Sequence, residues 1–114
     1  MGCDIELYRQ EVRQAYEAAG DECFLDNKDN IACFSQEQRT KLSERLQRYG
    51  YRILSNSPAT TTYTNGDSEA LLTDRGVYFS APWGDSVFDM LMTASEFTDS
   101  GEFAKFDPQT GQWE

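Results

Sequence analysis

The chain has 114 residues, with ten Lys and Arg against twenty Asp and Glu, no histidine and a formal net charge of −10. This charge repels phosphate backbones and argues against direct nucleic-acid binding, and the absence of histidine removes the commonest general base and metal ligand. The sequence has no apolar run of about 18 residues, so we expect no membrane span. An odd number of cysteines and no visible export signal favour reduced thiols and a cytoplasmic location.

Residues 4–19 have the pattern of an amphipathic helix. Ile5, Tyr8 and Val12 fall on one stripe of a helical wheel, with charged residues opposite them. Gly20 suits the end of such a helix, because glycine readily adopts the left-handed conformation found there. The sequence therefore predicts a first helix over this range.

Residues 22–34 are predicted to form a β-hairpin. Two short β-type segments flank the Asp- and Asn-rich stretch 26–30, whose side chains favour turns. Cys23 and Cys33 fall on the two expected strands. They either face each other in a disulfide or remain small, half-buried thiols, and the pattern leaves both alternatives open.

A second helix is predicted from Ser35 to Tyr49, followed by Gly50. Ser35 and Gln38 have the spacing of a capping box. The helix and the residues just after it form the most basic stretch of the chain: Arg39, Lys41, Arg45, Arg48 and Arg52. Residues 35–49 are therefore a candidate surface for a homodimer, in which they meet the acidic half of a second copy.

The segment from residue 51 to residue 81 reads as strands joined by short turns. Asn65-Gly66 is the strongest two-residue hairpin signal in the chain, and a second turn is expected at 74–76. The predicted strands cover residues 51–56, 59–64, 69–73 and 77–81.

A third helix is predicted from Asp85 or Ser86 to about Phe97, with a possible capping box between Ser86 and Asp89. Its apolar residues, Phe88 among them, gather on one side. The opposite side carries three acids: Asp85, Asp89 and Glu96.

The end of the chain, residues 103–114, reads as a last hairpin with a turn at 108–111. Helices do not alternate with single strands, and most links between strands are short. This order predicts one α+β domain over residues 1–114, with three helices packed on an antiparallel sheet built from hairpins.

The negative charge is concentrated in the second half of the chain. Residues 1–65 hold ten acids and eight bases, net −2, whereas residues 66–114 hold ten acids and two bases, net −8. These acids either keep the surface soluble or form a docking face for a cationic partner. The candidate docking residues, including one tryptophan of the kind that anchors interfaces, are Asp85, Asp89, Glu96, Asp99, Glu102 and Trp83.

No motif for a metal, a cofactor or a catalytic nucleophile appears. The cysteines form no Cys-x-x-Cys pair, the glycines form no phosphate-binding loop, and no Gly-x-Ser-x-Gly sequence occurs. We therefore predict no metal, no cofactor and no catalytic residues. An enzyme that works through carboxylates needs a concave pocket lined by two converging acids, and twenty acids offer no specific pair.

These observations predict a small, acidic, non-enzymatic protein-binding module that docks a basic partner. Inhibitors of the immunity type and proteins that mimic nucleic acids work on this physical logic, because they offer carboxylates where the target expects phosphates. The alternative is an accessory or structural homo-oligomer without catalytic activity. A carboxylate-dependent enzyme ranks third.

Overall fold

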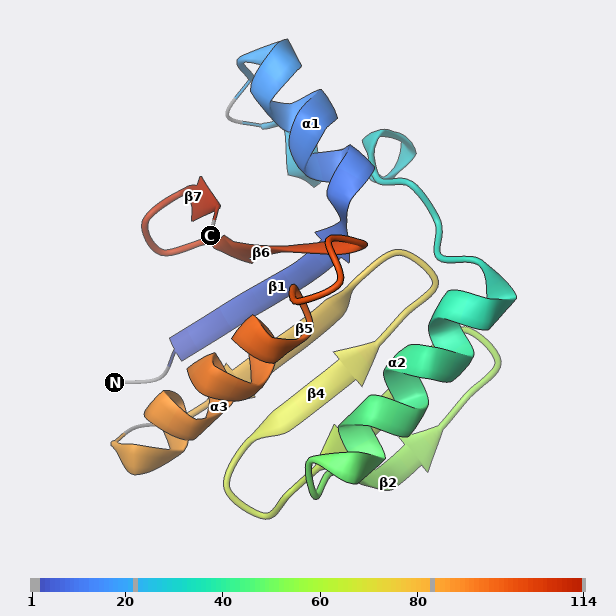
Figure 1. Ribbon diagram of the computed structural model, residues 1–114, viewed down its shortest axis with the longest axis vertical. Helices are drawn as coiled ribbons and strands as arrows, with labels where there is room; N and C mark the ends of the chain where they lie inside the picture. Colours follow the sequence, from blue (N-terminus) through green and yellow to red (C-terminus); the bar gives the residue numbers. More distant parts are fainter. Residues whose placement is uncertain (1–2, 22, 83, 114) are drawn as a thin grey trace.

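The computed structural model describes residues 3–21, 23–82 and 84–113. The strands are β1 (Cys3–Arg9), β2 (Arg52–Asn56), β3 (Thr61–Thr64), β4 (Glu69–Leu72), β5 (Val77–Ala81), β6 (Phe103–Asp107) and β7 (Gln112–Trp113). The helices are α1 (Gln10–Ala19), α2 (Gln36–Arg48) and α3 (Asp85–Glu96), with two 3₁₀ turns, η1 (Phe24–Asp26) and η2 (Lys28–Asn30). All seven strands join one antiparallel sheet in the order β2-β3-β4-β5-β1-β6-β7, and the predicted α+β class is confirmed (Figure 1).

The predicted first helix is wrong in its first half, which forms strand β1. Ile5 and Leu7 alternate with polar residues, and both are fully buried. A helix over this range would place Leu7 far from the stripe of Ile5, whereas a strand puts both side chains on one face. β1 hydrogen-bonds to β5 on one side and β6 on the other. Only the second half, from Gln10, is helical, and it ends at Gly20 as expected.

The predicted hairpin over residues 22–34 is also wrong. Residue 22 lies outside the described residues, and residues 23–34 form two 3₁₀ turns and an irregular segment. Their carbonyl groups accept hydrogen bonds from arginine side chains rather than from a neighbouring strand. Arg75 Nη1 donates to the carbonyls of Lys28 (2.7 Å) and Ile31 (2.8 Å), and Arg9 Nη1 donates to that of Cys33 (2.8 Å). Cys23 and Cys33 are exposed, free thiols, so the disulfide alternative is not realised.

The second and third helices are confirmed. Ser35 and Gln38 form the predicted capping box of α2, with Gln38 N donating to Ser35 Oγ at 3.1 Å and Ser35 N to Gln38 Oε1 at 2.9 Å. The capping box expected for α3 is wrong. Gly84 occupies the N-cap position instead and provides no side-chain cap. Its φ of +63° is a backbone conformation that residues other than glycine rarely adopt.

The predicted hairpins are confirmed: β2, β3, β4 and β5 pair each with the next along the chain, and β6 pairs with β7. At the β3–β4 turn, Asn65 Oδ1 accepts from the backbone N–H groups of Asp67 (2.9 Å) and Ser68 (2.8 Å), while Gly66 has φ +96°. β2 lies at one edge of the sheet, and all five of its residues are exposed.

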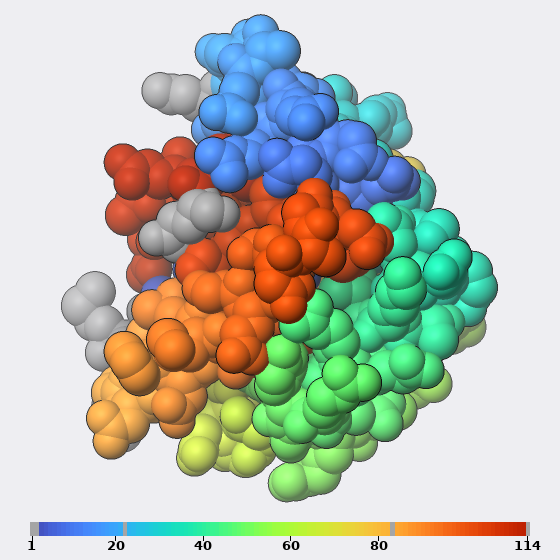
Figure 2. Space-filling model, in the orientation of Figure 1, coloured from blue at the N-terminus to red at the C-terminus, as the bar shows by residue number. Residues whose placement is uncertain are grey.

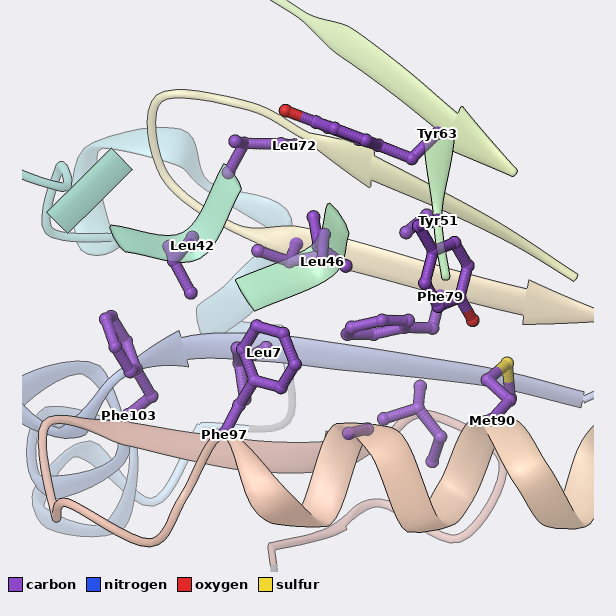
Figure 3. Close-up of a cluster of buried hydrophobic side chains, with 14 of the residues drawn as sticks. Leu7, Leu42, Leu46, Tyr51, Tyr63, Leu72, Phe79, Met90, Phe97 and Phe103 are labelled. Carbon is purple, nitrogen blue, oxygen red and sulfur yellow. The ribbon is translucent and has the colours of Figure 1, made fainter. Parts of the chain in front are cut away.

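The sheet separates two groups of buried side chains. Helices α2 and α3 cover one face, where they enclose the larger core (Figure 1). Figure 3 draws part of this core, with Leu46 of α2 near Leu7 and Phe79 of the sheet. The smaller cluster combines Tyr8 and Phe106 with residues of α1 and η1. Because neighbouring residues of a strand point to opposite faces, this second cluster lies on the other side of the sheet.

Candidate functional site

The outer face of α3 carries the three acids that the wheel placed there. Asp85, Asp89 and Glu96 are all exposed. Phe88 and Met92 are 64% and 54% exposed and lie within the same arc of the helix. The prediction that Phe88 belongs to the apolar side is therefore wrong. We call the five residues Asp85, Phe88, Asp89, Met92 and Glu96 the α3 ridge.

Asp99 lies just beyond α3 and forms an ion pair within the chain. Arg45 of α2 reaches its carboxylate at 3.2 and 3.3 Å, and also donates to the Glu96 carbonyl at 2.9 Å. The hydrogen bond from Arg45 lowers the pKa of Asp99. The same guanidinium lies 4.9 Å from the ring centroid of Phe97. Arg45 therefore binds the end of α3 to α2.

Glu102 is likewise engaged by α2. Its carboxylate lies 3.9 Å from Lys41 Nζ and 3.5 Å from Gln38 Nε2, which donates to it. Figure 2 shows the surfaces of α2 and α3 side by side on one face of the molecule. Two basic residues of the predicted dimer surface, Lys41 and Arg45, thus meet acids of their own chain. Trp83, the sixth candidate, lies outside the described residues.

The predicted site is therefore divided by the structure. Asp85, Asp89 and Glu96 come together on an exposed face with two apolar side chains, whereas Asp99 and Glu102 serve contacts inside the chain. The ridge is held firmly from behind, because Met90, Ala94 and Phe97 of the same segment are almost fully buried. Lys105 Nζ, beneath the helix, donates to Ser95 Oγ at 2.6 Å.

A pocket on the opposite face of the sheet was not predicted. It has a volume of about 580 Å³ and opens between α1, η1 and the β6–β7 turn. Two carboxylates and four aromatic rings line it: Glu6, Asp26, Tyr8, Tyr16, Tyr78 and Phe106. We call it the aromatic pocket.

Burial and hydrogen bonding perturb the titrating groups of the aromatic pocket. Burial raises the pKa of Glu6, the hydrogen bond from Tyr8 opposes this, and the charges of Asp4 and Asp26 add to the increase. The Tyr8 hydroxyl donates to Glu6 Oε1 at 2.6 Å. Burial and this bond raise the pKa of Tyr8 far above its ordinary range. Burial also raises the pKa of Tyr78.

The pocket was not predicted because a helix over residues 4–19 puts Glu6 on the solvent side. In the observed strand, Glu6 and Tyr8 share one face and point away from Leu7. The alternation of Asp4, Glu6 and Tyr8 with Ile5 and Leu7 is the signal that could have indicated it. Asp26 and Tyr78 arrive from distant segments, for which no local signal exists.

Neither the described side chains nor the known protein families point to a metal site or a membrane span. Within residues 3–21, 23–82 and 84–113, His, Cys, Asp and Glu side chains form no group of three or more suited to a metal. Among the helices of the described chain, none has the length and apolarity needed to cross a membrane. No protein-family model matches the sequence, and no curated protein shows significant similarity to it.

Proposed function

We propose that this protein is a small acidic binding module that docks a basic protein through the α3 ridge. One observation supports the proposal most directly: two large apolar side chains, Phe88 and Met92, stand exposed among three carboxylates on a rigid helix. Apolar residues ringed by charges are typical of a protein-protein interface. The partner is expected to present lysine or arginine residues around an apolar depression.

The two kinds of side chain have different roles in this proposal. Burial of the exposed parts of Phe88 and Met92 contributes about 2–3 kcal/mol of favourable binding free energy. The three ridge acids, with the net charge of −10, speed the encounter with a cation and select against acidic partners. Asp99 and Glu102 are excluded from the docking set because α2 already binds them.

The test compares four purified baits in a capture from the source-cell lysate. The baits are the wild type, an acid variant (D85N, D89N, E96Q), an apolar variant (F88S, M92S) and a matched control. The control, D29N with E44Q and D67N, removes three exposed acids elsewhere on the surface and produces the same net charge. Circular dichroism checks that all four fold.

A basic protein retained by the wild type and the control, and lost from both ridge variants, supports the proposal. Its purified form should then bind more weakly as salt rises, with a flatter salt dependence for the acid variant. Equal retention by the acid variant and the control contradicts the proposal, since acidity in general would then explain binding. Retention of nothing basic by the wild type also contradicts it.

The alternatives keep a lower rank. A homodimer through residues 35–49 remains a prediction, but Lys41 and Arg45 would have to leave acids of their own chain to form it. The carboxylate enzyme requires a concave pocket lined by two converging acids; Glu6 and Asp26 both line the aromatic pocket, and this alternative stays a prediction. The cytoplasmic location is also part of the proposal, because a reducing compartment suits three free thiols.

A further inference from the structure

The aromatic pocket has no part in the proposed docking function. Its lining residues on the strands, such as Glu6 and Tyr78, alternate with Leu7 and Phe79, which face α2 and α3. The pocket therefore opens on the side of the sheet away from the α3 ridge. A volume of about 580 Å³ falls within the range of small-molecule sites, roughly 300–1,000 Å³.

Four aromatic rings belong to the pocket wall, and they pack against one another. Tyr8 packs edge-on against Tyr78 with ring centroids 6.0 Å apart, and Tyr16 lies 5.8 Å from Phe106. Trp113 of β7 supports three of these rings from behind, at 6.1 Å from Tyr8, 5.5 Å from Tyr16 and 5.0 Å from Phe106. Because these rings already pack against one another, binding of a ligand would immobilise few additional side chains.

Both charged residues among the described lining residues are acids. The other described residues of the lining are uncharged, so Glu6 and Asp26 have no basic side chain beside them in this part of the wall. Glu6 Oε1 accepts from the Tyr8 hydroxyl, and within the described parts of the chain its second oxygen, Oε2, accepts no hydrogen bond. A half-buried carboxylate loses part of its hydration, and a cation bound beside it offsets that loss.

We propose that the aromatic pocket binds an organic ammonium group, with Glu6 and Asp26 supplying charge and the partly exposed rings of Tyr16 and Tyr78, backed by the buried rings of Tyr8 and Phe106, enclosing its alkyl substituents. Aromatic faces attract cations through their quadrupole, and cages of aromatic rings with nearby acids recognise quaternary and methylated ammonium ions. The site fits this chemistry better than a metal ion, because Ca²⁺ needs six to eight oxygen ligands. It fits better than a neutral apolar ligand, which would leave both carboxylates without a counter-charge.

The test follows amide resonances of the ¹⁵N-labelled protein during titration with choline. A parallel titration uses 3,3-dimethylbutan-1-ol, in which carbon replaces the charged nitrogen and the shape is kept. Choline should shift the amide resonances of the pocket residues in a saturable way, and the neutral alcohol should bind with an affinity at least about tenfold lower.

A third titration with a short peptide that carries trimethyl-lysine separates the two sources of the cation. Tighter binding of the peptide points to a protein side chain, and tighter binding of choline to a free metabolite.

Two single-charge variants complete the experiment. E6Q keeps an acceptor for the Tyr8 hydroxyl but removes the charge, and should weaken choline binding by about tenfold or more. E44Q on α2 makes the same charge change on the opposite face and should bind as the wild type does. Equal shifts by choline and the alcohol, equal affinity of E6Q and E44Q, or no saturable shift at millimolar choline would each overturn the proposal. The acid variant of the α3 ridge should retain choline binding, so this test and that of the docking function fail separately.

Discussion

The hydrogen bond between Tyr51 and Ser68 allows a quantitative test of how this fold treats buried polar groups. Tyr51 Oη and Ser68 Oγ lie 2.7 Å apart, and the two residues are 2% and 3% exposed. Ser68 Oγ donates to Asn65 Oδ1 at 3.3 Å, so its lone pair accepts the proton of Tyr51. Replacing Ser68 by alanine therefore leaves the Tyr51 hydroxyl buried without its acceptor.

The expected magnitudes follow from this chain of donors. An unpaired buried hydroxyl costs about 1–3 kcal/mol, so S68A should lower the free energy of unfolding by that amount. Y51F removes the donor and leaves Ser68 bonded to Asn65, at a cost of about 0.5–1.5 kcal/mol. The double variant leaves no unsatisfied hydroxyl and should lose about 1 kcal/mol less than the sum. For a chain of this size, 1 kcal/mol corresponds to a melting-temperature shift of about 3–6 °C.

Urea unfolding followed by circular dichroism measures these free energies for the wild type, both single variants and the double variant. S80A, at an exposed serine on β5, is the matched control and should change the free energy of unfolding little. Losses that add within about 0.3 kcal/mol would refute the reasoning. So would an S68A variant as stable as S80A.

Two further predictions concern pH. Burial raises the pKa values of Tyr8, Tyr51 and Tyr78, so the folded state keeps protons that the unfolded chain releases above about pH 10. The free energy of unfolding should therefore fall as the pH rises above about 10. Urea titrations that show no loss up to about pH 11 would contradict this prediction. The raised pKa of Glu6 means that its charge opposes folding at neutral pH, so E6Q should be more stable than the wild type at pH 7. This gain should shrink as the pH falls through the raised pKa of Glu6, and it should be gone below the ordinary glutamate value of about 4.3. Urea titrations at several pH values measure it, and a variant less stable at pH 7 would show that the Tyr8 bond outweighs burial.

The elements that the sequence predicted correctly depend on contacts within a few residues. The capping box of α2 joins Ser35 to Gln38, and the β3–β4 turn depends on Asn65 bonding to its next neighbours. Both patterns are visible in a short window. Strand β1 is different, because Ile5 and Tyr8 also satisfy a helical spacing. The burial of Leu7, which decides the matter, comes from distant partners in the sheet and in α2 and α3.

The candidate site shows the same division. A helical wheel was enough to group Asp85, Asp89 and Glu96 on one exposed face. The positions of Asp99 and Glu102 were not predictable in this way, since their cationic partners, Arg45 and Lys41, lie on α2, more than fifty residues earlier. The aromatic pocket draws on six separate elements and turns, so its composition could not be read from any single stretch of the chain.

The central position of β1 has a consequence for how the protein is made. Leu7 pairs with Val77 on one side and with Lys105 on the other, so this strand is synthesised well before either of its neighbours. A nascent chain that stops short of β6 exposes Ile5 and Leu7 together with a row of unpaired backbone groups, which is a hazard for aggregation on the ribosome. Sheets assembled from such remote segments fold in milliseconds to seconds rather than microseconds. β1 is thus incorporated late, because the central sheet cannot form until β5 and β6 have both been synthesised.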